Sequence, residues 1–105
     1  MDTDKLDLLI LKSLTLAPLH GYGVGQRIEQ LSGGAFRITL GALYPALRRL
    51  ERAGHVKGSW STSDNNRRAR FYALTRAGRR RLSTGQESWG RMVAAMLLVL
   101  RADGD

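Results

Sequence analysis

The start of the chain carries apolar side chains at helical spacing on two sides. Asp2 and Thr3 can cap a helix there, and Pro18 ends it. One apolar stripe consists of Leu6, Leu9, Ile10 and Leu14. Three further leucines, Leu8, Leu11 and Leu16, lie off that stripe. Because a helix that is apolar on two faces must be buried on both, the pattern indicates a partner beyond its own domain.

Two further helices are predicted, each closed by glycine. The second begins near Tyr22, and the run SGG at residues 32–34 ends it, because glycine adopts the left-handed C-cap conformation without strain. The third begins between Thr39 and Gly41, and the sequence ERAG closes it. Pro45 is tolerated best near the first turn of a helix, so we expect the third helix to start within this range. A kink at Pro45 is also possible in this interpretation. The inner side of this helix carries Leu43, Leu47 and Leu50.

After that glycine the period of the pattern changes to two. HVKGSW and RRARFYALT alternate side chains as strands do, and the polar run STSDNN between them predicts a β-hairpin. Thr75 can cap a final helix that runs to about Arg101. Within it Trp89, Val93, Met96 and Leu100 step by four, three and four, as in the seam of a coiled coil.

The predicted order is three helices, a hairpin and a long helix, which makes the fold mainly α with a small β-hairpin. This is the order of a winged helix-turn-helix, in which the second helix of the pair enters the major groove and the hairpin lies along the DNA backbone. We therefore expect a winged helix-turn-helix DNA-binding domain over residues 1–74 and a separate C-terminal helix over residues 75–105.

The positive charge of the chain is concentrated in its middle. Seventeen Lys and Arg stand against nine Asp and Glu, a net charge of +8. Between Arg27 and Arg81 there are thirteen basic and three acidic residues, whereas each flank carries two basic and three acidic ones. Such a run can be a solvated face. Its confinement between two nearly neutral helical segments favours a polyanion as partner, with double-stranded DNA the leading candidate.

Composition and spacing exclude several classes of function. The 105-residue chain has no cysteine, and His20 and His55 each stand alone, as capping or surface residues do. No spacing typical of a metal site or an activated nucleophile appears, so we expect no metal, no cofactor and no enzymatic activity. We find no signal peptide, and the apolar run of residues 93–100 is far shorter than the ~20 residues of a membrane span. We expect a soluble cytoplasmic protein with no membrane partner.

The stretch HGYGVGQRIEQL, residues 20–31, raises the question of a nucleotide-binding loop. The fingerprint G-x-G-x-x-G fails, because the sixth position from Gly21 is Gln26 and that from Gly23 is Ile28. What remains is a helix N-terminus whose N–H groups and dipole can meet a DNA phosphate, with Tyr22 beside it. The alternative is that the glycines merely permit a tight turn between helices.

The third helix and the hairpin carry side chains suited to DNA. Gly41 and Ala42 are small enough for the backbone to approach the floor of a groove, and Tyr44 can reach a phosphate or a base. Arg48 can read guanine with two hydrogen bonds, whereas Arg49 suits a phosphate. The predicted DNA-binding residues are Tyr22, Thr39, Gly41, Ala42, Tyr44, Pro45, Arg48, Arg49, Lys57, Arg67, Arg68 and Arg70.

Several motifs together resemble one family. LDLLILKSL, HGYGVGQRI, LGALYPALRRLERAGHV and RRARFYALTRAGRRRL are similar to the PadR family of bacterial transcriptional regulators, over residues 6–82. The short C-terminal segment resembles the compact subgroup, which has a single dimerisation helix. The resemblance implies a homodimeric winged-helix repressor that binds palindromic operators, with Tyr22 and Tyr44 near DNA.

The resemblance also implies that the first and last helices form the dimer. Some compact members place a tryptophan in a pore at the dimer interface that takes flat aromatic effectors, and Trp89 in ESWGRM matches it; a buried core tryptophan is the simpler alternative. The residues expected in this interface or pore are Leu8, Leu11, Trp89, Met92, Val93, Met96 and Leu100.

The chain departs from the family pattern at two positions. His55 stands where an apolar or aromatic residue is usual, which puts packing at the start of the wing in doubt. Gly25 replaces the more usual alanine, at up to about 1 kcal/mol of helix stability. Two other functions stay open: a non-specific architectural DNA-binding protein, and a protein-interaction module whose wing meets an acidic partner.

Overall fold

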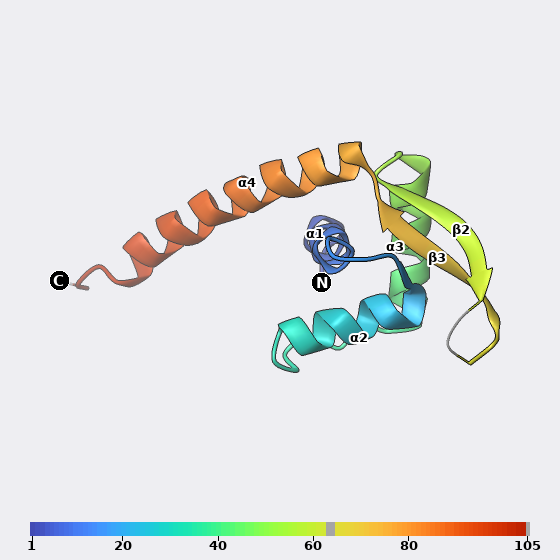
Figure 1. Cartoon of the computed structure of the whole chain (residues 1–105). Helices are drawn as coiled ribbons and strands as arrows, with labels where there is room; N and C mark the ends of the chain where they lie inside the picture. The colour runs from blue at the N-terminus through green and yellow to red at the C-terminus, as the bar shows by residue number, and fades with distance from the viewer. Residues whose placement is uncertain (63–64, 105) are drawn as a thin grey trace.

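The computed structural model describes residues 1–62 and 65–104 as four helices and a small sheet (Figure 1). The elements are α1 (Thr3–Ser13), β1 (Leu19–His20), α2 (Gly21–Leu31), α3 (Leu40–Arg52), β2 (Val56–Thr62), β3 (Arg68–Leu74) and α4 (Arg76–Leu100). The predicted order of three helices, a hairpin and a long fourth helix is confirmed. Ser63 and Asp64, in the predicted turn, and Asp105, at the end of the predicted C-terminal segment, lie outside the described residues.

Side-chain caps fix where the helices begin. The Asp2 carboxylate accepts from the Lys5 backbone N–H at 2.9 Å, and Thr39 and Thr75 cap α3 and α4 in the same way. Each such cap contributes about 1 kcal/mol. Because α3 begins at Leu40, Pro45 falls in its second turn, and the helix continues through it to Arg52. The proline removes one helical hydrogen bond, the one its own N–H would have donated to an earlier carbonyl.

The sheet has three antiparallel strands in the order β1-β3-β2, where the sequence predicted only the hairpin. Leu19 pairs with Tyr72 and His20 with Phe71, so the short β1 ties the start of α2 to the wing. Tyr72 is the residue of β3 that enters the core, opposite Gly58 of β2. Burial raises the pKa of the Tyr72 hydroxyl above its ordinary value.

The core lies where α1 meets α2, α3 and the first turns of α4. Its fully buried side chains include Ile10, Leu11, Val24, Leu43 and Leu47. Leu11 is 0% exposed, so the prediction that it faces a partner is wrong. The two apolar faces of α1 are real, but neighbouring helices of the same chain cover the face that holds Leu11.

The long helix α4 leaves the rest of the molecule after its first turns (Figure 1). Two glycines let those turns approach closely. A Cβ on Gly78 would lie 2.0 Å from the carbonyl oxygen of His55, and one on Gly85 would lie 2.2 Å from the Leu8 side chain. Every described residue from Gln86 onward is exposed. The Cα atoms accordingly extend over 62 × 28 × 22 Å.

The two departures from the family pattern have structural explanations. His55 is half-buried and makes polar contacts: its backbone carbonyl accepts from Thr75 at 3.2 Å, and its ring nitrogen Nδ1 lies 3.3 Å from Arg81 Nη1. Gly25 lies against the core, where a Cβ would stand 2.9 Å from a terminal methyl of Leu43. Alanine at this position would gain helix propensity but press on a fully buried leucine.

Candidate nucleic-acid interface

One face of α3 is free of the core and presents the predicted groove-facing residues together. Leu43, Ala46, Leu47 and Leu50 point inward and are buried. The opposite, exposed face carries Gly41, Ala42, Tyr44, Pro45 and Arg48, with Thr39 as the N-cap. A Cβ on Gly41 would meet nothing closer than the Thr39 hydroxyl at 3.8 Å. The start of α3 therefore offers a smooth backbone surface beside two large side chains, Tyr44 and Arg48.

The start of α2 adjoins that face through Tyr44. A Cβ on Gly21 would lie 2.6 Å from the Tyr44 ring, so the ring occupies the space that a side chain would need. Tyr22 is exposed and its ring stacks on that of His20, with 6.4 Å between centroids. Tyr22 and Tyr44 thus both lie at the start of α2: Tyr22 follows Gly21 in the sequence, and the Tyr44 ring packs against Gly21.

His20 is the cap of α2, as one of the two sequence interpretations of this residue held. Its Nδ1 accepts from the backbone N–H of Gly23 at 3.0 Å, and its ring meets Phe71 edge-on at 5.4 Å. The sequence predicts that free N–H groups at the start of α2 bind a DNA phosphate. One of them, the N–H of Gly23, already donates to His20 within the chain. The close backbone approach at Gly21 also has a partner in the protein, the Tyr44 ring.

The wing carries a cluster that the sequence interpretation did not identify. Trp60 on β2 pairs with Arg70 on β3, and the guanidinium carbons of Arg68 and Arg70 lie 5.1 and 5.7 Å from the centre of its ring. Arg70 also forms an ion pair with Glu51 of α3. Because strand neighbours share a face, a tryptophan directly opposite an arginine-rich strand was the signal available in the sequence. Lys57 and Arg67, also predicted here, are exposed.

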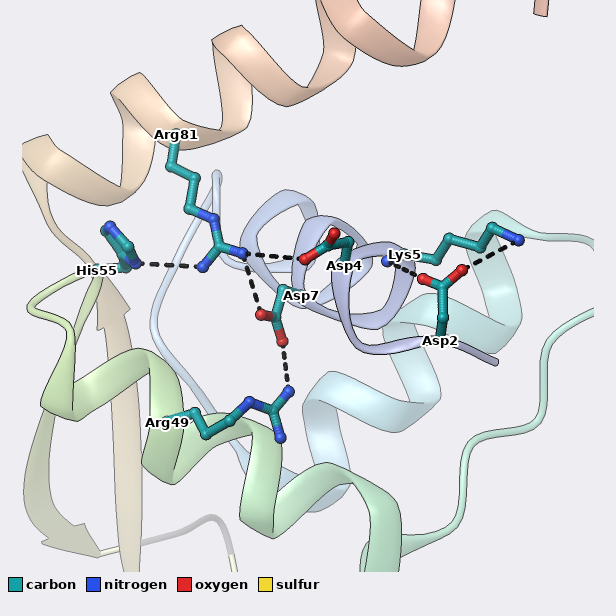
Figure 2. A network of polar contacts seen from close by, with 7 residues as sticks. All are labelled: Asp2, Asp4, Lys5, Asp7, Arg49, His55 and Arg81. Atoms are coloured by element: carbon teal, nitrogen blue, oxygen red, sulfur yellow. Dashed lines mark hydrogen bonds and ion pairs between the residues drawn. The ribbon is translucent and has the colours of Figure 1, made fainter. Parts of the chain in front are cut away.

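Arg49 occupies a different environment from its neighbour Arg48. Its Nη2 donates to Oδ1 of Asp7 on α1 at 2.8 Å, and the other carboxylate oxygen of Asp7 accepts from Arg81 of α4 at 3.1 Å (Figure 2). Asp7 is only 3% exposed. The Arg49 guanidinium therefore binds a buried carboxylate on the side of α3 that faces α1, while its side chain stays 43% exposed. Its contact with a DNA phosphate stays a prediction.

The residues predicted for the dimer interface or pore, other than Leu11, lie along α1 and α4. Trp89 is 37% exposed, and Met92, Val93, Met96 and Leu100 are more exposed than Trp89. Leu8 is half-buried and touches Gly85 of α4. An apolar cleft of about 790 Å³ opens between the two helices, with Leu8, Leu9, Leu82 and Trp89 in its walls and Phe36 at its side. Lys5 Nζ lies 5.6 Å above the Trp89 ring.

Two features are absent from residues 1–62 and 65–104. None of the helices there is long and apolar enough to cross a membrane. Within the same ranges, no three His, Cys, Asp or Glu side chains gather where they could hold a metal ion.

Comparison with known proteins gives a consistent result. Residues 10–84 match the model of the transcriptional regulator PadR-like family. A 37.1 kDa protein of transposon TN4556 from Streptomyces fradiae is 38% identical over 92 residues, which are 88% of this chain but 25% of that protein. The chain therefore spans about a quarter of the length of this relative.

Solved structures share the fold over nearly the whole chain. A PadR family transcriptional regulator from Eggerthella lenta is similar with a TM-score of 0.79 and 25% identity, over 94% of this chain and 84% of that one. A PadR-like transcriptional regulator from Bacillus cereus has a TM-score of 0.80 at 20% identity, over 93% of each chain. The second likeness concerns the fold alone.

Proposed function

The chain belongs to the PadR-like family, whose members are transcriptional regulators and not enzymes, and on this premise we propose that it is a homodimeric repressor that binds a palindromic operator through α3 and the wing. The observation that carries the proposal is the exposed face of α3. It combines a smooth N-terminal backbone at Gly41 and Ala42 with Tyr44 and Arg48. An arginine that can bond guanine through two N–H groups, beside a backbone able to enter the groove, is suited to reading sequence.

The wing supports the same orientation on DNA. Lys57, Arg67 and Arg68 are exposed on the hairpin, where a winged helix meets the phosphate backbone. Phosphate contacts from such residues position the protein, while base contacts from α3 select the sequence. Arg70, which binds Glu51, supports the wing from the side of α3.

Self-association is proposed to run through α4 and α1. The second half of α4 exposes Trp89, Met92, Val93 and Met96 on one side, and an apolar seam of this kind is stable in water only when a second helix covers it. A two-fold dimer places two α3 helices in successive major grooves on one side of the duplex, which is why the operator should be palindromic.

DNA binding by fluorescence anisotropy tests this function. The fragment upstream of the chain's own gene should bind at least ~10³-fold more tightly than random DNA of equal length. The logarithm of affinity should fall with the logarithm of salt concentration at a slope of about −0.9 per phosphate contact. Equal affinity for both DNAs would instead indicate the architectural protein. A flat salt response would indicate a module that binds an acidic protein.

A small planar aromatic effector is a further part of the proposal, supported by the apolar cleft beside Trp89. Its volume of about 790 Å³ lies in the range of small-molecule sites, roughly 300–1,000 Å³, and Trp89 offers a ring for stacking. The test uses the Trp60→Phe variant, in which Trp89 is the remaining tryptophan. A flat aromatic dye should quench its fluorescence saturably and weaken DNA binding; quenching without an effect on DNA binding would contradict an effector role.

A further inference from the structure

One buried carboxylate connects the recognition helix α3 with the long helix α4. The side chain of Asp7, on α1, is 5% exposed, and each of its oxygens accepts from a different arginine. Arg49 reaches it from α3 and Arg81 from α4, at 2.8 and 3.1 Å (Figure 2). We call these three residues the Asp7 clamp. Helix α1 lies between α3 and α4, and these two helices meet chiefly through α1. The Asp7 clamp therefore connects α3 to α4 across α1.

The chemistry of the clamp is better suited to fixing the orientation of the helices than to stabilising the folded protein. Removing a carboxylate from water is expensive, and a buried ion pair often does no better for stability than well-packed apolar side chains. What two guanidinium groups on one carboxylate do provide is direction, because each N–H must point along a lone pair of its own oxygen. A rotation of α3 about its axis would carry Arg49 away from Asp7.

The other contacts at this junction leave the start of α4 little freedom. The Thr75 hydroxyl donates to the Gly54 carbonyl at 2.7 Å, and the Thr75 N–H donates to the His55 carbonyl at 3.2 Å. Gly78 packs directly on that same carbonyl oxygen. Arg81 bonds the His55 ring on one side and Asp7 on the other. The turn after α3 and the first turns of α4 are therefore one packed unit, and the Asp7 clamp ties this unit to the last turn of α3, where Arg49 lies.

We propose that Asp7 is a positioning residue: it fixes the rotation of α3 relative to α4, and so sets the spacing and angle of the two recognition helices in the dimer. This inference rests on the proposed function, because it needs α4 as the dimer helix and α3 as the reader of DNA. Arg49 then acts through Asp7, and its neighbour Arg48 remains the arginine that faces the groove.

The first test measures the geometry of one chain without DNA. The chain has no cysteine, so the double variant Ala42→Cys, Glu87→Cys accepts spin labels at two exposed positions, one in the first turn of α3 and one on α4. A large excess of unlabelled chain keeps labelled chains apart in a dimer. Pulsed EPR should give a narrow distribution of distances between the labels, and Asp7→Asn should broaden it. Asp4→Asn is the matched control: Asp4 lies on the same helix and also faces Arg81, at 3.9 Å, but its side chain is exposed, and an exposed ion pair contributes little.

The second test measures the consequence for DNA with unlabelled protein. Inserting one base pair between operator half-sites turns them by roughly 35° and separates them by about 3.4 Å. The wild-type chain and Asp4→Asn should lose about tenfold or more in affinity for this DNA, since duplex and protein must deform to fit it. Asp7→Asn should lose less than about threefold, because its α3 helices can turn to follow the half-sites.

The two measurements separate the inference from the function on which it rests. Asp7→Asn that melts at a lower temperature but keeps both the narrow distances and the spacing preference would overturn the inference, because Asp7 then only stabilises the fold. Broadened distances with an unchanged spacing preference would overturn its consequence for DNA. A wild-type chain with no preference for any promoter DNA would contradict the proposed function instead, and the distance measurement would then decide the role of Asp7 alone.

A second variant keeps the inference testable should Asp7→Asn fail to fold. Arg49→Met leaves Asp7 paired with Arg81 and frees α3 alone. It should broaden the label distances and weaken the spacing preference, while the slope of affinity against salt stays as in the wild type. A slope smaller in magnitude by about 0.9, with distances unchanged, would show that Arg49 contacts a phosphate and would refute the clamp.

Discussion

The residues up to Leu82 and the second half of α4 differ in how a single chain buries their apolar side chains. In the first region Ile10, Leu43 and Leu47 have no exposed surface. In the second, Leu98 is 77% exposed although apolar residues make up a larger share of this segment than of the first region. A helical pattern thus tells which side chains must be covered, but the structure of one chain shows only those it covers itself. The following predictions test that division.

The largest effect is expected in the core. Leu11→Ala should lower the free energy of unfolding by about 2–5 kcal/mol, because it leaves a cavity among fully buried side chains. Thermal unfolding should show this loss at every protein concentration. Met96→Ala is the matched change on α4. The melting temperature of a dimer rises with protein concentration, and this variant should reduce that rise while leaving the melting temperature at low concentration unchanged. A loss at Met96 that is independent of concentration would show that its own chain already covers this residue.

The next effect concerns self-association. Trp89→Asp should weaken the dimer by about 2–4 kcal/mol, since a charge replaces an aromatic side chain at the centre of the proposed seam. Sedimentation should then show monomers at concentrations where the wild type is dimeric, with the circular dichroism of a folded chain in both. An intact dimer would place the interface elsewhere. Arg91→Asp, a change on the same helix outside the seam, serves as the control.

The sequence predicted the elements well, because their signals are local. Asp2 and Thr75 cap their helices as the pattern indicated, α3 begins at Leu40 within the predicted range, and the change of period after α3 marks the wing. The strand β1 was missed because two residues carry no period, and they become a strand only when they pair with β3. Leu11 was assigned to a partner for a similar reason: the pattern gives two apolar faces without saying which chain covers them.

The candidate site was harder to predict where neighbouring residues are alike. Arg48 and Arg49 have the same chemistry, yet adjacent residues of a helix point about 100° apart. Asp7 selects one of them, and nothing near Asp7 in sequence links it to a residue 42 positions away. Trp60 was overlooked because its role depends on strand register, which places Arg70 opposite it. Contacts across elements are the part of a site that periodicity does not contain.

A smaller effect is expected for the exposed face of α3, whose residues do not need DNA in order to fold. Tyr44→Ala should weaken operator binding by about 1–3 kcal/mol, because it removes a large side chain from the exposed face of α3. The melting temperature should change little, since Tyr44 is 41% exposed. Tyr44→Phe keeps the ring over Gly21 and removes the hydroxyl, so it separates a hydrogen bond from packing. Unchanged affinity in Tyr44→Ala would exclude this residue from the interface.

The smallest effects compare two glycines of one helical turn. At Gly23 a Cβ would meet its nearest atom, in the Leu19 side chain, at 3.4 Å, which is ordinary contact. Gly23→Ala should therefore raise the free energy of unfolding by up to about 1 kcal/mol through helix propensity. Gly21→Ala gains the same propensity but places its Cβ 2.6 Å from the Tyr44 ring, and the ring must move. We expect Gly21→Ala to cancel the gain in stability and to weaken operator binding, whereas Gly23→Ala leaves operator binding unchanged. Equal behaviour of the two variants in denaturation and anisotropy would show that α2 does not need glycine at residue 21, and that the position of Tyr44 does not depend on it.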